Sequence, residues 1–159
     1  MDPEAQLTAL LDAARGLQQV GIAFALIGGL AVGIRTRVPR ATIDIDLAAL
    51  TSASRERVTG ALVSAGFVCR GTFPHSINFL HRNGEPLQVA FDAEFDQMIE
   101  RAEPIEFRGI RIPVVSTEDL ISMKERAARD PGRRRSKSLR DLADNEPLRG
   151  DIPEEDEGW

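Results

Sequence analysis

The sequence predicts a single-domain α/β fold in which a mixed β-sheet is flanked by helices. Its 159 residues match the usual length of one domain, and a chain of this size can bury about two-thirds of its unfolded surface. Segments with apolar residues at helical spacing alternate with short apolar runs that are typical of strands. The composition, 42% hydrophobic and 28% charged, is that of a globular protein.

The first half of the chain alternates helix and strand signals. Asp2 and Pro3 supply an N-cap and a first-turn proline, and leucines at helical spacing follow until Gly21. A short apolar run then ends in Gly28-Gly29, as a buried strand does when it enters a tight turn. The expected elements are a helix from Pro3 to Gly21, a strand at 24–27, a helix at 30–35, a basic loop at 36–41, a strand at 43–47 and a helix at 54–65.

The second half predicts mainly short strands. Asn83-Gly84 favours a two-residue hairpin turn between two of them. Ser116, with Asp119 three residues later, forms a capping box that opens a helix. The expected elements are strands at 67–70, 77–81, 87–91, 105–107 and 110–115 and helices at 94–102, 116–129 and 138–145. The domain is expected to span 1–146, and the acidic residues 147–159 to form a disordered tail.

Composition and charge exclude several classes of protein. The single cysteine, Cys69, can form no internal disulfide and no thiolate zinc site. No apolar run approaches the ~20 residues of a membrane span, so we expect no membrane association. The chain opens with neither the basic region nor the apolar block of a signal peptide, which predicts a cytoplasmic location. The net charge is −5, but basic residues concentrate at 124–140, where phosphates could bind.

Asp44 and Asp46 are the strongest candidates for metal binding. They lie two apart in a predicted strand, so both side chains point to one face while the neighbouring isoleucines and leucine point to the other. Two such carboxylates can share a hard cation such as magnesium with substrate phosphates. The alternative is an exposed strand face on which one acid caps a neighbouring helix.

Gly28-Gly29 stands between a predicted strand and a predicted helix. In this arrangement bare backbone N–H groups and a helix N-terminus face an anion. A dinucleotide-binding fold is excluded because the pattern G-x-G-x-x-G is absent. A pair of glycines is also common in ordinary turns, so the pair alone does not define a phosphate site.

Together these features resemble a known signature. The segment GGLAVGIRTRVPRATIDIDL (28–47) is similar to that of the nucleotidyltransferase superfamily, and its part R-x-T-x-D-I-D-L (40–47) most resembles the AbiEii/AbiGii-type toxin nucleotidyltransferases. The resemblance continues through FDQMIERA (95–102), VVSTEDLISMK (114–124) and RDLADNE (140–146). It therefore covers most of the chain before the acidic tail.

This resemblance implies a nucleotidyltransferase-like fold and assigns site roles. In such proteins the aspartates bind magnesium or manganese, the glycine turn holds a nucleoside triphosphate (NTP), and a third carboxylate on a later strand completes the site. The residues that match these roles are Asp44 and Asp46 for metal and catalysis, and Gly28, Gly29, Arg40 and Thr42 for the nucleotide.

Gln88 departs from the pattern, because it stands where the third carboxylate is expected. An amide accepts no proton from an attacking hydroxyl and is a poor magnesium ligand. Asp92 is a further candidate metal ligand. It would lie ~13 Å along an extended strand from Gln88, so it could serve only if the strand end bends back.

Two residues near the C-terminus complete the candidate site. Lys124 falls in the middle of an apolar helix stripe, and the resemblance implies that it contacts nucleotide phosphates and takes part in catalysis. The alternative is a side chain that covers apolar surface with its stem. Asp141 corresponds by resemblance to a family active-site acid, or else is a solvated helix residue.

Three functions remain open. The first is a magnesium-dependent, toxin-like transfer of a nucleoside monophosphate from an NTP to RNA, such as tRNA, or to protein, with a cognate antitoxin as a further partner. The second is a degenerate relative that binds nucleotide or a partner without catalysis, which Gln88 favours. The third is a transferase that modifies a small, antibiotic-type molecule.

Overall fold

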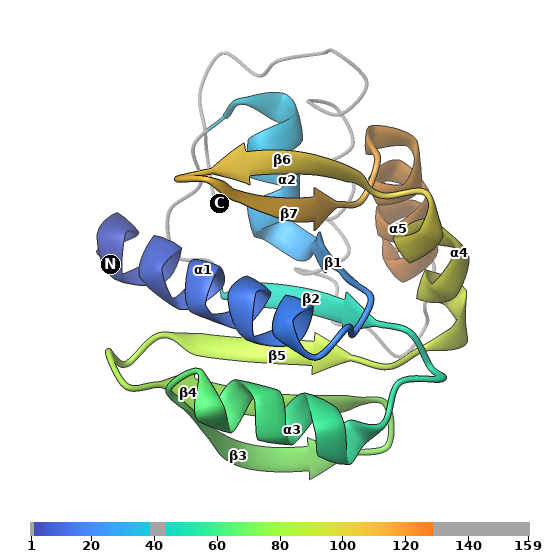
Figure 1. Cartoon of the computed structure of the whole chain (residues 1–159). Coiled ribbons are helices and arrows are strands. Elements are labelled where there is room, and N and C mark those ends of the chain that lie inside the picture. Colours follow the sequence, from blue (N-terminus) through green and yellow to red (C-terminus); the bar gives the residue numbers. More distant parts are fainter. Residues whose placement is uncertain (1, 39–43, 129–159) are drawn as a thin grey trace.

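The strands form one mixed sheet in the order β3-β4-β5-β2-β1-β7-β6 (Figure 1). The computed structural model describes residues 2–38 and 44–128. Within this part, the strands are β1 (Phe24–Ile27), β2 (Ile45–Ala49), β3 (Phe67–Phe73), β4 (Ser76–His81), β5 (Pro86–Ala90), β6 (Glu103–Phe107) and β7 (Ile110–Val114). The helices are α1 (Pro3–Gln19), α2 (Gly28–Thr36), α3 (Arg55–Ser64), α4 (Asp96–Glu100) and α5 (Thr117–Ala128), with a 3-10 turn, η1, at Ala93–Phe95. The predicted α/β class with a mixed sheet is confirmed.

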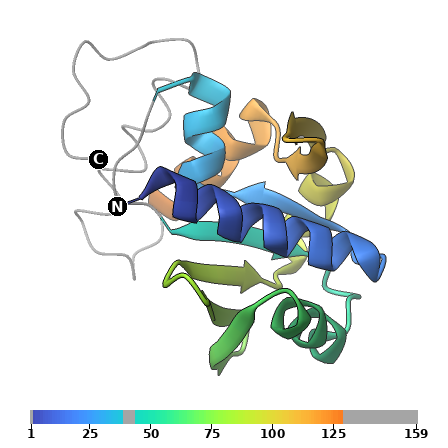
Figure 2. The ribbon, with the colours of Figure 1, turned by 60° about the vertical axis from the view of Figure 1, so that its left-hand side comes forward.

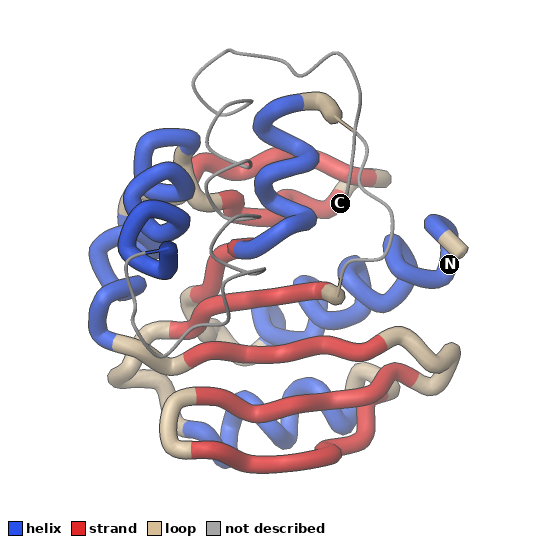
Figure 3. The backbone as a smooth tube through the Cα atoms, turned by 180° about the vertical axis from the view of Figure 1, so that it is seen from behind, coloured by secondary structure: helices blue, strands red, loops and turns tan. Residues whose placement is uncertain are grey.

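Strand β2 lies at the centre of the sheet. It pairs antiparallel with β1 and parallel with β5, and β1 pairs parallel with β7. Helices α1 and α3 lie on one face of the sheet, and Figure 2 shows the length of α1 crossing the strands. Helices α2 and α5 lie on the other face, which is seen in Figure 3. In the described part of the chain, no helix is long and apolar enough to cross a membrane.

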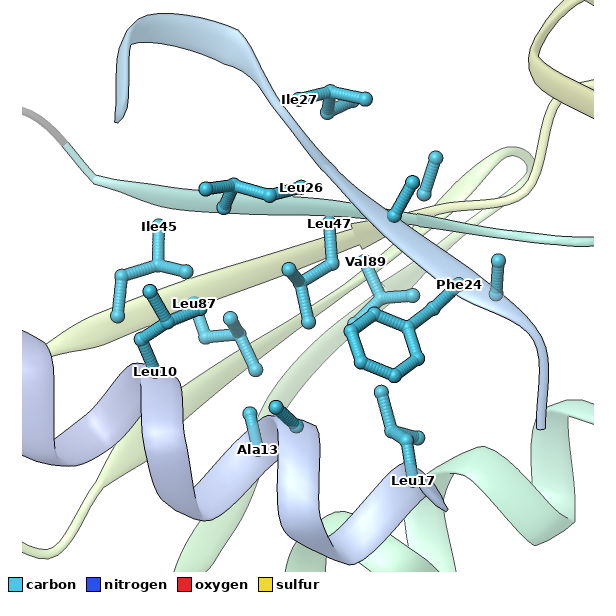
Figure 4. Packing of buried hydrophobic residues seen from close by; sticks show 14 of the residues in the cluster. Leu10, Ala13, Leu17, Phe24, Leu26, Ile27, Ile45, Leu47, Leu87 and Val89 are labelled. Atoms are coloured by element: carbon cyan, nitrogen blue, oxygen red, sulfur yellow. The ribbon is translucent and has the colours of Figure 1, made fainter. Parts of the chain in front are cut away.

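The core lies between α1 and the sheet. Leu10, Ala13 and Leu17 of α1 point toward Leu47 of β2 and Val89 of β5 (Figure 4), and all five are at most 2% exposed. The alternation in β2 and β5 therefore buries one set of side chains under α1 and turns the other set to the opposite face.

Most predicted elements are confirmed, and the differences have local causes. Helix α2 begins directly at Gly28, without the expected turn, because Gly28 itself takes the left-handed φ of +72°. Strand β2 continues through Ala48, which pairs with both β1 and β5, and Ala49, which pairs with β1, although alanine is not typical of strands. The predicted start of this strand at residue 43 lies outside the described residues, as do the helix at 138–145 and the tail at 147–159.

The hairpin between β4 and β5 differs from the predicted two-residue turn. His81 N–H donates to the carbonyl of Glu85 at 2.8 Å, and Gly84 N–H donates to the carbonyl of His81 at 2.8 Å. The loop is therefore one residue longer, with Gly84 at a φ of +93°, as in hairpins with a left-handed third loop residue. The hairpin at Arg108-Gly109 is confirmed.

Candidate active site

Asp44 and Asp46 lie at the start of β2 and line one cavity of about 260 Å³. Asp44 is exposed and directly precedes the strand, whereas Asp46 lies within it and is half-buried. Because Ile45 and Leu47 point into the core under α1, the aspartates face the other side of the sheet. The structure thus places both carboxylates at one cavity.

Gly28 is in direct contact with Asp46. Strand β1 pairs with β2 so that Ile27 lies opposite Asp46, and Gly28 follows at once. A Cβ added to Gly28 would lie 2.5 Å from Oδ2 of Asp46 and 3.0 Å from its Cβ. Only glycine leaves room for this carboxylate, which therefore lies beside the first residue of α2, where backbone N–H groups have no partner within the helix.

Gln88 lies on the other side of Asp46. Parallel pairing of β2 with β5 sets Gln88 opposite Asp46, and antiparallel pairing of β5 with β4 sets Asn78 opposite Gln88. Asp46, Gln88 and Asn78 thus form a row across adjacent strands, spaced about 4.8 Å apart. We call the side of β2, β5 and β4 that carries this row the open face, because no described helix crosses it in Figure 3.

Asp92 lies away from the aspartate pair. It follows the end of β5, whereas Gln88 is the middle residue of that strand and lies beside Asp46. The Asp92 carboxylate accepts a hydrogen bond from Glu94 N–H at 3.1 Å and so caps η1. Within the described ranges, no group of three or more His, Cys, Asp or Glu side chains could hold a metal ion. The structure therefore does not bring Asp92 to Asp44 and Asp46.

Lys124 is half-buried on α5, and α5 packs against α2, the helix that begins at Gly28. The half-burial of Lys124 agrees with its predicted position in the apolar stripe of α5. In that stripe Leu120 is buried and Ile121 is half-buried. The remaining predicted site residues, Arg40, Thr42 and Asp141, lie outside the described residues. So do residues 129–140 of the basic segment at 124–140.

The cavity contains two polar residues that sequence reasoning did not select, Arg70 of β3 and Asn78 of β4. Asn78 alternates with the buried residues Ile77 and Phe79 of β4, and this pattern could have predicted that Asn78 lies on the polar face of the strand. No local signal relates Arg70 to the aspartates, because that proximity depends on the order of the strands in the sheet.

The donor set fits one hard divalent cation. Mg²⁺ is commonly held by one or two carboxylates together with substrate phosphates, and Asp44 and Asp46 are two carboxylates at one cavity. The glycine contact that leaves space for the Asp46 carboxylate is a second feature that fits such a site. These two residues would hold the cation.

Comparison with solved structures defines the class of fold. At 16% identity and a TM-score of 0.63, the chain resembles the lincosamide antibiotic adenylyltransferase LnuA in its lincomycin-bound form, over 94% of this chain and 98% of that one. It resembles ANT(2")-Ia in complex with adenylyl-2"-tobramycin at the same identity of 16% and TM-score of 0.63, over 94% of this chain and 90% of that one. The chain also resembles an antigenic nucleotidyltransferase-like protein from Paracoccidioides brasiliensis, at 18% identity and a TM-score of 0.54, over 91% of this chain and 77% of that one. The fold is that of the nucleotidyltransferases.

The family model named Nucleotidyl transferase AbiEii toxin, Type IV TA system matches residues 9–148. The chain therefore belongs to the AbiEii nucleotidyltransferase family, as the resemblance at 28–47 predicted. A search of curated proteins finds no match.

Proposed function

We propose that this protein is a magnesium-dependent nucleotidyltransferase that moves a nucleoside monophosphate from an NTP to an acceptor hydroxyl on RNA. The observation that carries this proposal is the position of Asp46 between Gly28 and Gln88, with Asp44 at the same cavity. Membership in a toxin family of type IV toxin–antitoxin systems supports a toxin-like role and a cognate antitoxin as a partner.

The two flanks of Asp46 suit the two substrates. On one flank, the N-terminus of α2 at Gly28-Gly29 offers backbone N–H groups and a positive helix end to the triphosphate. Lys124, on the helix packed against α2, is proposed to contact its phosphates. On the other flank lies the cavity, where Arg70 supplies positive charge for a phosphate of the acceptor. Arg40, Thr42 and Asp141 keep the roles that the family motifs assign to them.

The reaction requires positioning and charge neutralisation more than covalent chemistry. The acceptor hydroxyl oxygen attacks the α-phosphorus and its proton passes to water, while the bond from that phosphorus to the oxygen bridging to the β-phosphate breaks and pyrophosphate leaves. A magnesium ion held by Asp44 and Asp46 would offset negative charge on the phosphate oxygens. Through that cation the two aspartates would orient the triphosphate, and the cavity holds the acceptor hydroxyl near the α-phosphorus.

A second candidate function is nucleotide binding without turnover. It is favoured by Gln88, since the amide beside Asp46 cannot take the proton of the attacking hydroxyl. Incubation with radiolabelled NTPs and magnesium, in parallel with total RNA, a protein extract and a small-molecule extract, separates the candidates. Transfer of label to RNA supports the transferase, whereas tight NTP binding without transfer to RNA, protein or small molecules supports the second candidate.

The aspartate pair provides a direct test of the site. The double substitution Asp44→Asn and Asp46→Asn removes both negative charges while keeping side-chain size, so magnesium-dependent NTP binding should fall by at least a hundredfold in calorimetry. The melting temperature should change little, because neither side chain belongs to the apolar core.

Asp92→Asn is the matched control for that test. It removes one carboxylate just beyond the end of β5, and asparagine can still cap η1. NTP affinity should equal that of the wild type. Unchanged NTP binding in the double variant, or an equal loss in Asp92→Asn, would show that the aspartate pair is not the metal site.

A further inference from the structure

Gln88 occupies the position from which a side chain of β5 faces the same space as Asp46. The two residues are register partners on parallel strands, separated by one strand spacing of about 4.8 Å. Both line the cavity on the open face, together with Asp44. Gln88 is exposed, so core packing does not dictate which residue stands there.

Gln88 brings no negative charge to this space. A carboxamide oxygen can contact a cation but carries no net negative charge, and the NH₂ group beside it is a donor that cations repel. Two divalent cations about 4 Å apart repel each other strongly and need anionic ligands on both sides. Of the described residues at the cavity, only Asp44 and Asp46 are carboxylates, and no third acid joins them in a metal-binding group.

We infer that the site binds a single divalent cation with the triphosphate, and that Gln88 determines this number by withholding a negatively charged ligand from a second cation. The inference rests on the proposed function, because it assumes that Asp44 and Asp46 hold a cation together with an NTP. It assigns Gln88 as a determinant of cation number, which the proposed function does not require.

The test counts Mn²⁺ ions by electron paramagnetic resonance. The full chain is mixed in equal amounts with an α,β-methylene NTP analogue, which cannot be cleaved between the α- and β-phosphates. Equilibrium dialysis with labelled analogue first establishes that the nucleotide is bound. The wild type should then bind one Mn²⁺ per bound analogue, without the spin coupling that a pair of ions at about 4 Å produces.

Two substitutions place the same new charge at different distances from Asp46. Gln88→Asp adds a carboxylate one strand away, and it should raise the count to two with a spin-coupled signal. Asn78→Asp adds a carboxylate on the same face but two strand spacings away, at about 9.6 Å, so its count should stay at one. Gln88→Glu is a second variant at the inferred position, and circular dichroism confirms that each variant is folded.

Each outcome decides a separate point. No retention of the analogue by the wild type would contradict the proposed function itself. Retention with two coupled Mn²⁺ ions in the wild type would overturn the inference while leaving the proposed function standing. A count of one in folded, nucleotide-bound Gln88→Asp and Gln88→Glu, or a count of two in Asn78→Asp, would show that residue 88 does not determine the number of cations.

Discussion

Gly28 takes a φ of +72° directly against the carboxylate of Asp46. Gly28→Ala should therefore have two effects. The left-handed backbone should lower the free energy of unfolding by about 1–2 kcal/mol, and the new Cβ should push the Asp46 carboxylate from its place. We expect a loss of at least tenfold in metal-dependent NTP affinity by calorimetry, with stability measured by urea denaturation.

Gly21 offers a matched control for the backbone effect. It has the same φ of +72°, but a Cβ added there meets no atom within 4 Å. Gly21→Ala should lower the free energy of unfolding by a similar amount and leave NTP affinity unchanged. If both variants lost affinity equally, or if Gly28→Ala retained it, the contact between Gly28 and Asp46 would not matter for binding.

The positions of individual site residues could be predicted from the sequence where a local pattern indicates them. The period-two spacing of Asp44 and Asp46 predicted a shared face, and the structure places both at one cavity. The sequence could not relate Asn78 or Arg70 to them, because the order β3-β4-β5-β2 is set by pairing between distant segments. Gln88 was found only because the family motif creates an expectation at that position.

At the scale of elements, α5 begins at a network that includes the predicted capping box. Asp119 N–H donates to Oγ of Ser116 at 3.2 Å, and the Ser116 hydroxyl donates to Asp119 Oδ2 at 3.1 Å. The Arg101 guanidinium also donates to both oxygens of Asp119. Hydrogen bonding and charge attraction from Asp119 raise the pKa of Arg101 above its ordinary value. Sequence spacing predicts the first contact, but not the link from α5 to the end of α4.

Ser116→Ala removes this cap and should lower the free energy of unfolding by about 1 kcal/mol, as measured by urea denaturation. Ser122→Ala is the control, because it makes the same change at an exposed position inside the same helix. Alanine is the better helix former there, so stability should stay the same or rise slightly. A loss of equal size in both variants would mean that the hydroxyl of Ser116 does not stabilise the start of α5.

Over the whole molecule, the central strands carry the apolar core on one face and the proposed site on the other. Side chains under α1 form the core, where Leu47 is completely buried, and the alternate side chains form the row Asp46, Gln88 and Asn78 on the open face. The sequence predicts this division because the alternation in each strand is local. The partners of each strand depend on the packing of the complete chain, which no local pattern contains.

Leu47→Ala and Gln88→Ala test this division from opposite faces of adjacent strands. Leu47→Ala leaves a cavity beneath α1 and should lower the free energy of unfolding by about 2–5 kcal/mol, a large part of the ~5–15 kcal/mol typical of a domain. Gln88→Ala truncates an exposed side chain and should change it by no more than about 0.5 kcal/mol.

Binding should respond independently of stability in these two variants. NTP affinity per folded molecule of Leu47→Ala, measured by calorimetry without denaturant at 10 °C, should equal that of the wild type, because Leu47 points away from the aspartates. Gln88→Ala should keep one cation per bound nucleotide, since alanine supplies no more ligand than the amide does. A fall in affinity of folded Leu47→Ala that matched its loss of stability would show that the core face and the open face are energetically coupled through the central strands.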